Sequence, residues 1–202
     1  MEIKRLCIAT NNRGKFEEYR AFFMREEFDV EVVSYGEDLP EDVERGETFY
    51  ENAINKAIFV SNSTGLPTLA DDSGLVVHAL NGEPGVKSRR WMGIDDDEER
   101  NRFLLKKMEG IKWEERKATF VCVIAFVLPC GTGFFVKGEV NGYILDEMRG
   151  KKGFGYDPVF FYPPAGKTFA EMEMEEKNSL SHRAVAFKKF APSFSAMRKI
   201  LG

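Results

Sequence analysis

Strand-like and helical segments alternate along the first part of this chain, and this alternation restricts its possible folds more than any other feature. Arg5 to Ala9 is expected to form a short buried strand, and Lys15 to about Met24 a helix. Asp29 to Val33 alternates as a second strand. The capping-box spacing of Thr48 and Glu51 predicts the start of another helix. Strands that alternate with helices are typical of an α/β protein.

The later part of the chain predicts further strands and two more helices. Strands are expected at 67–70, 75–80, 117–128 and 134–140, and a charged helix at about 95–108. A last helix should run from about Ser181 to Ala191, where Pro192 interrupts or kinks it. We therefore predict a single domain of the α/β class, residues 1–202, with a mixed β-sheet flanked by helices and a two-lobed cleft.

Composition and charge exclude several classes of protein. The chain has 202 residues, of which 43% are hydrophobic and 31% charged, as in an ordinary globular protein. A net charge of -4 argues against a protein that coats nucleic acid. The longest apolar run, Phe120 to Leu128, is too short to cross a membrane, so no membrane partner is expected. Three cysteines without a CxxC pair fit a reducing cytoplasm.

Two adjacent carboxylates, Asp71 and Asp72, follow an apolar segment and precede Ser73 and Gly74. This pattern suggests a strand that ends in a polar tip. Adjacent side chains of a strand point to opposite faces, so at most one of the two acids should face a given cleft. That acid could hold Mg²⁺, which prefers oxygen ligands. Alternatively, the acids form an Asx-turn and only bind their own backbone.

Two further loops carry polar side chains. A loop between the first strand and the first helix, residues 10–15, has backbone N–H groups, a glycine and a lysine, and could bind phosphate or be a purely structural turn. An acidic loop at 41–46 contains Glu44. Glu44 could share a cation with Asp72, or the loop is simply solvated.

The last two motifs suit a nucleobase and an anionic or electron-rich group. Glycines and aromatic residues alternate in 150–158, where a ring could stack on a base and Asp157 could accept a hydrogen bond from a ring N–H. The alternative is a turn with two core aromatics. Ser181 is a candidate N-cap that leaves His182 and Arg183 in the first helical turn, which disfavours cations unless such a group binds nearby. Otherwise these residues form an exposed basic turn.

Together, these motifs resemble the inosine triphosphate pyrophosphatase family, also called the non-canonical purine NTP pyrophosphatase or Ham1-like family. The resemblance covers almost the whole chain and rests on the order of six segments, 10–15, 46–53, 70–75, 84–86, 153–158 and 181–183. It implies Mg²⁺-dependent hydrolysis of ITP, dITP and XTP to the monophosphate and pyrophosphate. It also implies a homodimer built on an elongated mixed sheet flanked by helices, with the active-site cleft between two lobes.

The resemblance further implies roles for single residues. Glu44 and Asp72 would bind the metal, and Asp72 would also be the catalytic base. Lys56 matches another basic position of the family. The substrate-binding residues would be Thr10, Asn11, Asn12, Arg13, Gly14 and Lys15 for the triphosphate, Ser73, the base-pocket residues Phe154, Gly155, Tyr156 and Asp157, and the basic residues Lys177, His182 and Arg183.

The chemistry of the base suggests how such a site would select its substrate. Hypoxanthine and xanthine present a 6-keto acceptor and an N1–H donor. A donor such as Arg183 or His182 and an acceptor such as Asp157 would match them, whereas adenine would leave the site's groups unpaired. Two other classes stay open: a nucleotide sensor without turnover, which has no need of both Glu44 and Asp72, and a phosphatase with an aspartyl nucleophile, which needs an Asp-x-Asp arrangement.

Overall fold

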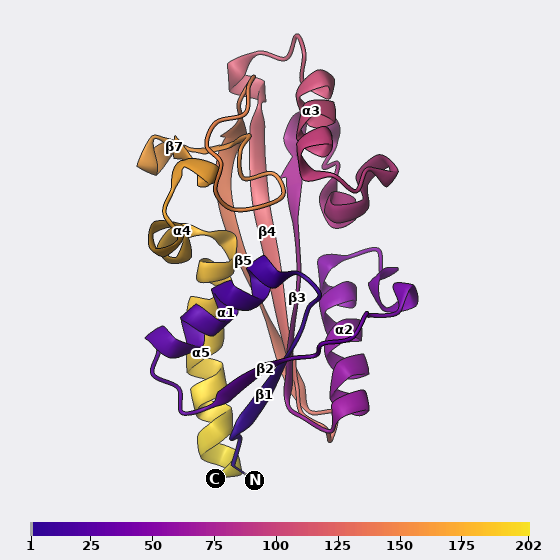
Figure 1. Cartoon of the computed structure of the whole chain (residues 1–202), viewed down its shortest axis with the longest axis vertical. Helices are drawn as coiled ribbons and strands as arrows, with labels where there is room; N and C mark the ends of the chain where they lie inside the picture. The colour runs from indigo at the N-terminus through magenta and orange to yellow at the C-terminus, as the bar shows by residue number, and fades with distance from the viewer. Residues whose placement is uncertain (1) are drawn as a thin grey trace. The chain divides into compact units, whose positions relative to one another are not determined.

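The structure is a computed structural model that describes residues 2–202 (Figure 1). Its strands are β1 (Arg5–Ala9), β2 (Glu31–Ser34), β3 (Thr68–Val77), β4 (Lys117–Val127), β5 (Gly133–Ile144), β6 (Phe160–Tyr162) and β7 (Lys167–Thr168). Its α-helices are α1 (Arg13–Arg25), α2 (Phe49–Thr64), α3 (Asp97–Lys107), α4 (Met174–Leu180) and α5 (His182–Leu201). Short 3₁₀ segments connect several of these elements.

The strands form one mixed sheet, which confirms the predicted α/β class. Their order is β2-β1-β3-β4-β5-β6-β7. Strand β1 pairs in parallel with β2 and β3, whereas β6 pairs antiparallel with β5 and β7. The chain divides into two compact units, one made of 2–72, 122–138 and 183–202 and the other of 73–121 and 139–182. Strands β3, β4 and β5 contribute residues to both units.

In the first unit, helices cover both faces of the sheet. Helices α1 and α5 lie on one face and α2 lies on the other (Figure 1). Strand β4 therefore alternates between two cores: Cys122 and Ile124 pack with α1 and α5, whereas Val123 and Ala125 pack with α2. Because both faces are buried, the strand reads as an almost continuous apolar run.

Strand β3 corrects one prediction. The expected strands at 67–70 and 75–80 are one continuous strand, so Asp71, Asp72 and Ser73 lie inside it and not at a polar tip or in an Asx-turn. The strand ends at Val77, and His78–Leu80 forms a 3₁₀ turn. The acids are tolerated inside the strand because each has a cationic side chain opposite it, on its own face of the sheet.

The predicted helix start at Thr48 is confirmed. The Thr48 side chain accepts a hydrogen bond from the Glu51 N–H, and the Glu51 carboxylate accepts one from the Thr48 N–H, so the capping box is complete. Asp96 caps α3 by accepting from the Glu99 N–H. These signals lie within a few residues of one another, which is why the sequence predicts them well.

Helix α5 does not end at Pro192, so the predicted interruption is wrong. The helix continues to Leu201. Phe187, Phe190 and Phe194 lie on both sides of the proline and are all buried in the core on this face of the sheet. We attribute the continuation to this packing, which offsets the roughly 3 kcal/mol that an internal proline costs. Even so, none of the helices in 2–202 is long and apolar enough to cross a membrane.

Candidate active site

The loop between β1 and α1 is built as a helix N-terminus. Asn12 caps α1, because its Oδ1 accepts a hydrogen bond from the Lys15 N–H at 3.0 Å. Thr10 Oγ1 in turn accepts from the Asn12 N–H at 3.1 Å. Asn11 and Arg13 are exposed, and Asn11 donates to Asp38. The first turn of α1 thus offers backbone N–H groups and the Lys15 ammonium, a combination that suits an anion.

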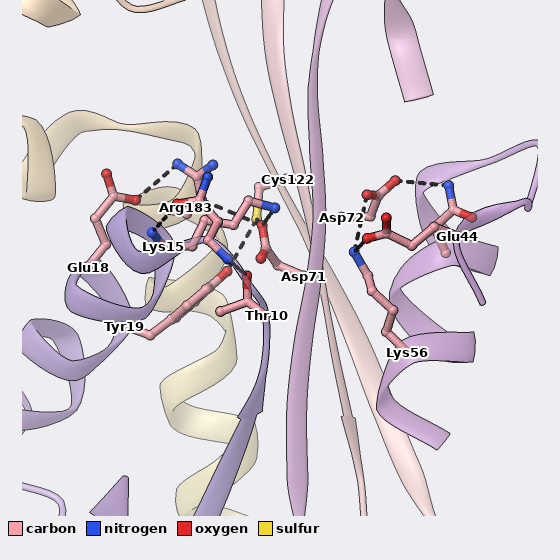
Figure 2. Close-up of polar contacts among 12 residues, drawn as sticks. Thr10, Lys15, Glu18, Tyr19, Glu44, Lys56, Asp71, Asp72, Cys122 and Arg183 are labelled. Carbon is pink, nitrogen blue, oxygen red and sulfur yellow. Dashed lines mark hydrogen bonds and ion pairs between the residues drawn. The ribbon is translucent and has the colours of Figure 1, made fainter. Parts of the chain in front are cut away.

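Asp71 and Arg183 belong to a buried cluster of charges on the α1–α5 face of β3 (Figure 2). Lys15 Nζ lies 3.0 Å from Asp71 Oδ2, and Arg183 Nε lies 3.5 Å from the same oxygen. Arg183 Nη1 also donates to Glu18 Oε2 at 2.9 Å. Two cations and two anions therefore balance one another; the Lys15 side chain is 14% exposed and the other three side chains are buried.

The protonation states in this cluster follow from its surroundings. Burial lowers the pKa of Arg183, but the charges of Glu18 and Asp71 outweigh this effect and raise it above its usual range. Burial, with the Asp71 charge, raises the pKa of Tyr19, whose hydroxyl lies 3.6 Å from Cys122 Sγ. Arg183 is therefore charged and Tyr19 neutral at physiological pH.

Asp72 points to the opposite face of β3, as the strand alternation predicts (Figure 2). Its Oδ1 lies 3.4 Å from Lys56 Nζ, and Glu44 Oε1 lies 3.0 Å from the same nitrogen. Asn52 Nδ2 donates to Asp72 Oδ2 at 3.2 Å. The two acids expected to bind metal thus converge on one cationic group. Lys56 holds that position with 4% of its side chain exposed.

Burial and charge oppose each other in this second cluster as well. Burial raises the pKa of Asp72, although the Lys56 and Lys15 charges act against it. Burial lowers the pKa of Lys56, but the charges of Asp72 and Glu44 outweigh this, so its pKa is raised. Asp72 is therefore a stronger proton acceptor than an exposed aspartate, and Lys56 stays protonated.

The donor set around Lys56 fits Mg²⁺. Both Glu44 and Asp72 present carboxylate oxygens, the ligands that this ion prefers, and both already face a common cation. Among residues 2–202, no three histidine, cysteine or acidic side chains are grouped closely enough to form a complete protein cage. An ion held by two carboxylates would take its other ligands from water and phosphate, as Mg²⁺ usually does.

In the second unit, the glycine-rich loop is organised around Asp157. Its Oδ2 accepts from Lys177 Nζ at 2.6 Å and from the Phe154 N–H at 3.0 Å. The Lys177 ammonium also lies 4.6 Å from the centre of the Phe154 ring, within range of a cation–π contact. Tyr156 is buried, and its hydroxyl donates to the Ser88 carbonyl at 3.0 Å. Three of the predicted base-pocket and basic residues, Phe154, Asp157 and Lys177, are thus brought together.

His182 and Ser73 both belong to the second unit. The His182 ring is buried and stacks on Phe120, with 4.6 Å between the ring centres. Ser73 is half-buried in the middle of β3. Their substrate contacts, like those of the other motif residues, remain predictions.

Four residues that contact the predicted site residues were not expected from the sequence. Glu18 contacts Arg183, Asn52 contacts Asp72, and Asp97 and Asn101 both contact the Gly155 backbone. Helical spacing offered a signal for some of them. Asn52 and Lys56 are four residues apart on α2, so they share a face, and both contact Asp72. A carboxylate or amide four residues from a motif residue on a capped helix is thus worth examining in such sequences.

Substitution of Gly153 should destabilise the loop more than substitution of Gly155. Both have positive φ, +75° and +62°, so either alanine is strained by roughly 1–2 kcal/mol. A Cβ at Gly153 would also overlap with Asp157 Oδ2, whereas a Cβ at Gly155 would meet nothing within 4 Å. We expect Gly153→Ala to lower the free energy of unfolding by about 1–3 kcal/mol more than Gly155→Ala. Urea denaturation measures both, and equal losses would contradict the predicted overlap.

Comparison with known proteins gives close relatives over nearly the whole chain. A dITP/XTP pyrophosphatase of Geobacter sulfurreducens is 48% identical over 90% of this chain and 92% of its own length. A protein of the same name from Thermus thermophilus is 46% identical over 94% of this chain and 91% of its own.

Solved structures agree with these relatives. A HAM1 protein from Coxiella burnetii superposes with a TM-score of 0.85 at 36% identity, covering 96% of this chain and 100% of the other. The Ham1 protein of Staphylococcus aureus gives a TM-score of 0.83 at 37% identity, with the same coverage. The model of the Ham1 family matches residues 6–193. The chain therefore belongs to the Ham1 family.

Proposed function

We infer that this chain is a nucleoside-triphosphate pyrophosphatase that hydrolyses non-canonical purine nucleoside triphosphates. Relatives that are 46–48% identical over at least nine-tenths of this chain carry the name dITP/XTP pyrophosphatase. We propose that ITP, dITP and XTP are its substrates, that the products are the nucleoside monophosphate and pyrophosphate, and that the reaction requires Mg²⁺. One observation above all supports the mechanism: Glu44 and Asp72 face one cation position, while the Lys15 loop offers a phosphate site.

The phosphate chain would be bound by the first unit. The N–H groups at the start of α1 and the Lys15 ammonium would hold the terminal phosphates. Asp71 fixes Lys15, so the ammonium does not need to be ordered when the ligand arrives. Thr10 supports the same turn through its hydrogen bond to Asn12.

Asp72 would accept the proton of the attacking water as that water attacks the α-phosphorus. Asn52 and Lys56 hold its carboxylate in place. Glu44 and Asp72 would hold Mg²⁺, which when bound neutralises phosphate charge and acidifies water.

The base would be recognised by the Asp157 cluster of the second unit. Phe154 offers a ring face for stacking, and Asp157 an acceptor for the purine N1–H. The Lys177 ammonium is a fixed donor, since it is bonded to Asp157 and buried. Arg183 and His182 remain the other proposed donors to the 6-keto oxygen. A base with a 6-amino group would then place its own N–H donor against one of these protein donors, and no hydrogen bond would form between them.

We also propose that the protein acts in the cytoplasm as a homodimer and binds neither nucleic acid nor membrane. Cys7, Cys122 and Cys130 form no disulfide among residues 2–202, which suits a reducing compartment. The net charge of -4 does not suit a nucleic-acid-binding surface.

The site of bond cleavage tests the proposed reaction. Hydrolysis of dITP in oxygen-18 water, followed by mass spectrometry, should place the label in dIMP and release one pyrophosphate for each turnover. Chelation of Mg²⁺ should stop the reaction, and its return should restore it. Formation of dIDP and free phosphate as the first products would refute the proposal in favour of a phosphatase, and tight binding without turnover would favour a sensor.

A further inference from the structure

We propose that Asp97 and Asn101 of α3 are specificity-determining positioning residues, which hold the Gly155 backbone and thereby set the discrimination between 6-keto and 6-amino purines. This inference rests on the proposed function, which assigns the loop Gly153–Asp157 to the nucleobase.

Both polar groups of the Gly155 backbone are bound by side chains of α3. The Gly155 N–H donates to Asp97 Oδ2 at 2.6 Å, and Asn101 Nδ2 donates to the Gly155 carbonyl at 2.8 Å. Asp97 and Asn101 are four residues apart, so they lie on the same face of the helix, one turn from each other. Together they satisfy the N–H and the carbonyl of Gly155, as the backbone of a neighbouring β-strand does in a sheet.

The Asp97 carboxylate, which accepts from the Gly155 N–H, is itself held in place. Arg100 is bonded to Asp97 and is 4% exposed. Its Nη1 also donates to the carbonyls of Arg89, Ile94 and Asp95. The Asp97 side chain is 47% exposed, but it cannot follow a moving Gly155 without breaking its charge-assisted bond to the buried Arg100.

Gly155 occupies the position from which the proposed base-reading groups are aimed. It lies between Phe154, proposed to stack on the base, and Asp157, proposed to accept its N1–H. Its φ is +62°, and a Cβ at this position would meet nothing within 4 Å, so close packing on that side does not hold the residue in place. The two hydrogen bonds from α3 hold the Gly155 backbone instead. A loop released from them could shift both groups and accommodate a mismatched base.

The asparagine side chain at position 101 is not the choice that would make the fold most stable. Its side chain is buried, with 1% of the residue exposed, and its Oδ1 has no hydrogen-bond partner among residues 2–202. A buried acceptor without a partner is destabilising. Leucine, of similar size, would remove that acceptor together with the donor to Gly155. The opposing effects should leave the stability of Asn101→Leu close to that of the wild type, so discrimination and stability can be measured apart.

The test compares IMP with AMP as ligands, because these products keep the base and are not hydrolysed. We expect Asn101→Leu to reduce the ratio of the two dissociation constants about tenfold, the effect of one well-placed hydrogen bond. The ratio of kcat/KM for dITP and dATP should fall in parallel. Leu104→Ala is the matched control, because it removes a fully buried apolar side chain from the same helix: it should lower Tm and leave both ratios unchanged.

Three results would overturn the inference. They are an unchanged IMP/AMP ratio in Asn101→Leu, an equal change in Leu104→Ala, or no preference for IMP in the wild type. Asn101→Ala, which removes the donor and places no charge in the buried site, is the second variant and should give the same loss if the leucine variant does not fold. Wild-type protein that prefers IMP but releases no pyrophosphate from dITP would refute the proposed function alone, and the binding ratios would still decide the role of Asn101.

Discussion

Asp72→Asn should lower kcat for dITP hydrolysis by about 10²- to 10⁴-fold, the range expected for loss of a general base. The change keeps the shape of the side chain and removes its negative charge and its basicity. Asparagine can still meet Asn52, but it cannot take a proton from water or balance the Lys56 charge. Nucleotide binding should persist, because the Lys15 loop is unaltered. Single-turnover kinetics with dITP measures both effects, because the limiting rate constant reports the chemical step and the dependence of the rate on protein concentration reports dITP binding.

Asp71→Asn is the matched control in the same strand. Its side chain lies on the opposite face and contacts Lys15 and Arg183 but not Lys56. We expect a smaller loss of kcat, together with weaker triphosphate binding, since Lys15 loses its anchor. Equal losses of kcat at the two positions would contradict the assignment of Asp72 as the base.

Arg183→Met should lower the free energy of unfolding by about 3–5 kcal/mol, the usual cost of removing one partner from a buried ion pair. Methionine fills part of the volume, but Glu18 and Asp71 then stay buried without the guanidinium between them. Urea denaturation of the two proteins gives this difference. Lys199→Met, an exposed position near the end of the same helix, should change stability by less than about 0.5 kcal/mol.

The second arm of this experiment isolates the pair itself. If the loss comes from an uncompensated Glu18, then Glu18→Gln together with Arg183→Met should be more stable than the sum of the single changes predicts. Additive losses would mean that the packing of the Arg183 side chain, and not its charge, stabilises this face of the sheet.

Local signals predicted most of the fold. The capping box at Thr48 and the charged helix at about 95–108 each depend on neighbours a few residues away, and both were confirmed. The continuity of β3 could not be predicted in the same way. Asp71 and Asp72 read as turn residues until Lys15 and Lys56 are brought beside them, and those partners come from distant parts of the chain. Likewise, the phenylalanines that carry α5 through Pro192 act through tertiary packing.

The candidate site was predictable where a motif carries it. The Lys15 loop and the Asp157 loop stand out by residue type and spacing. Their supports do not, because burial decides their role. Glu18 and Asn101 look like ordinary surface residues of polar helices, yet they are 4% and 1% exposed. A sequence does not reveal which polar residue of a helix turns inward when its partner is a backbone group or a distant arginine.

Asp71 and Asp72 lie on opposite faces of β3, so their orientation depends on whether the number of residues inserted or deleted ahead of them in the strand is odd or even. Side chains alternate with a period of two, so deletion of Ala70 would carry Asp71 to the α2 face and Asp72 to the α1–α5 face. Both acids would then face the wrong cations at once. Ahead of these acids, β3 can therefore gain or lose residues only in even numbers, and every such step moves both carboxylates about 7 Å along the strand.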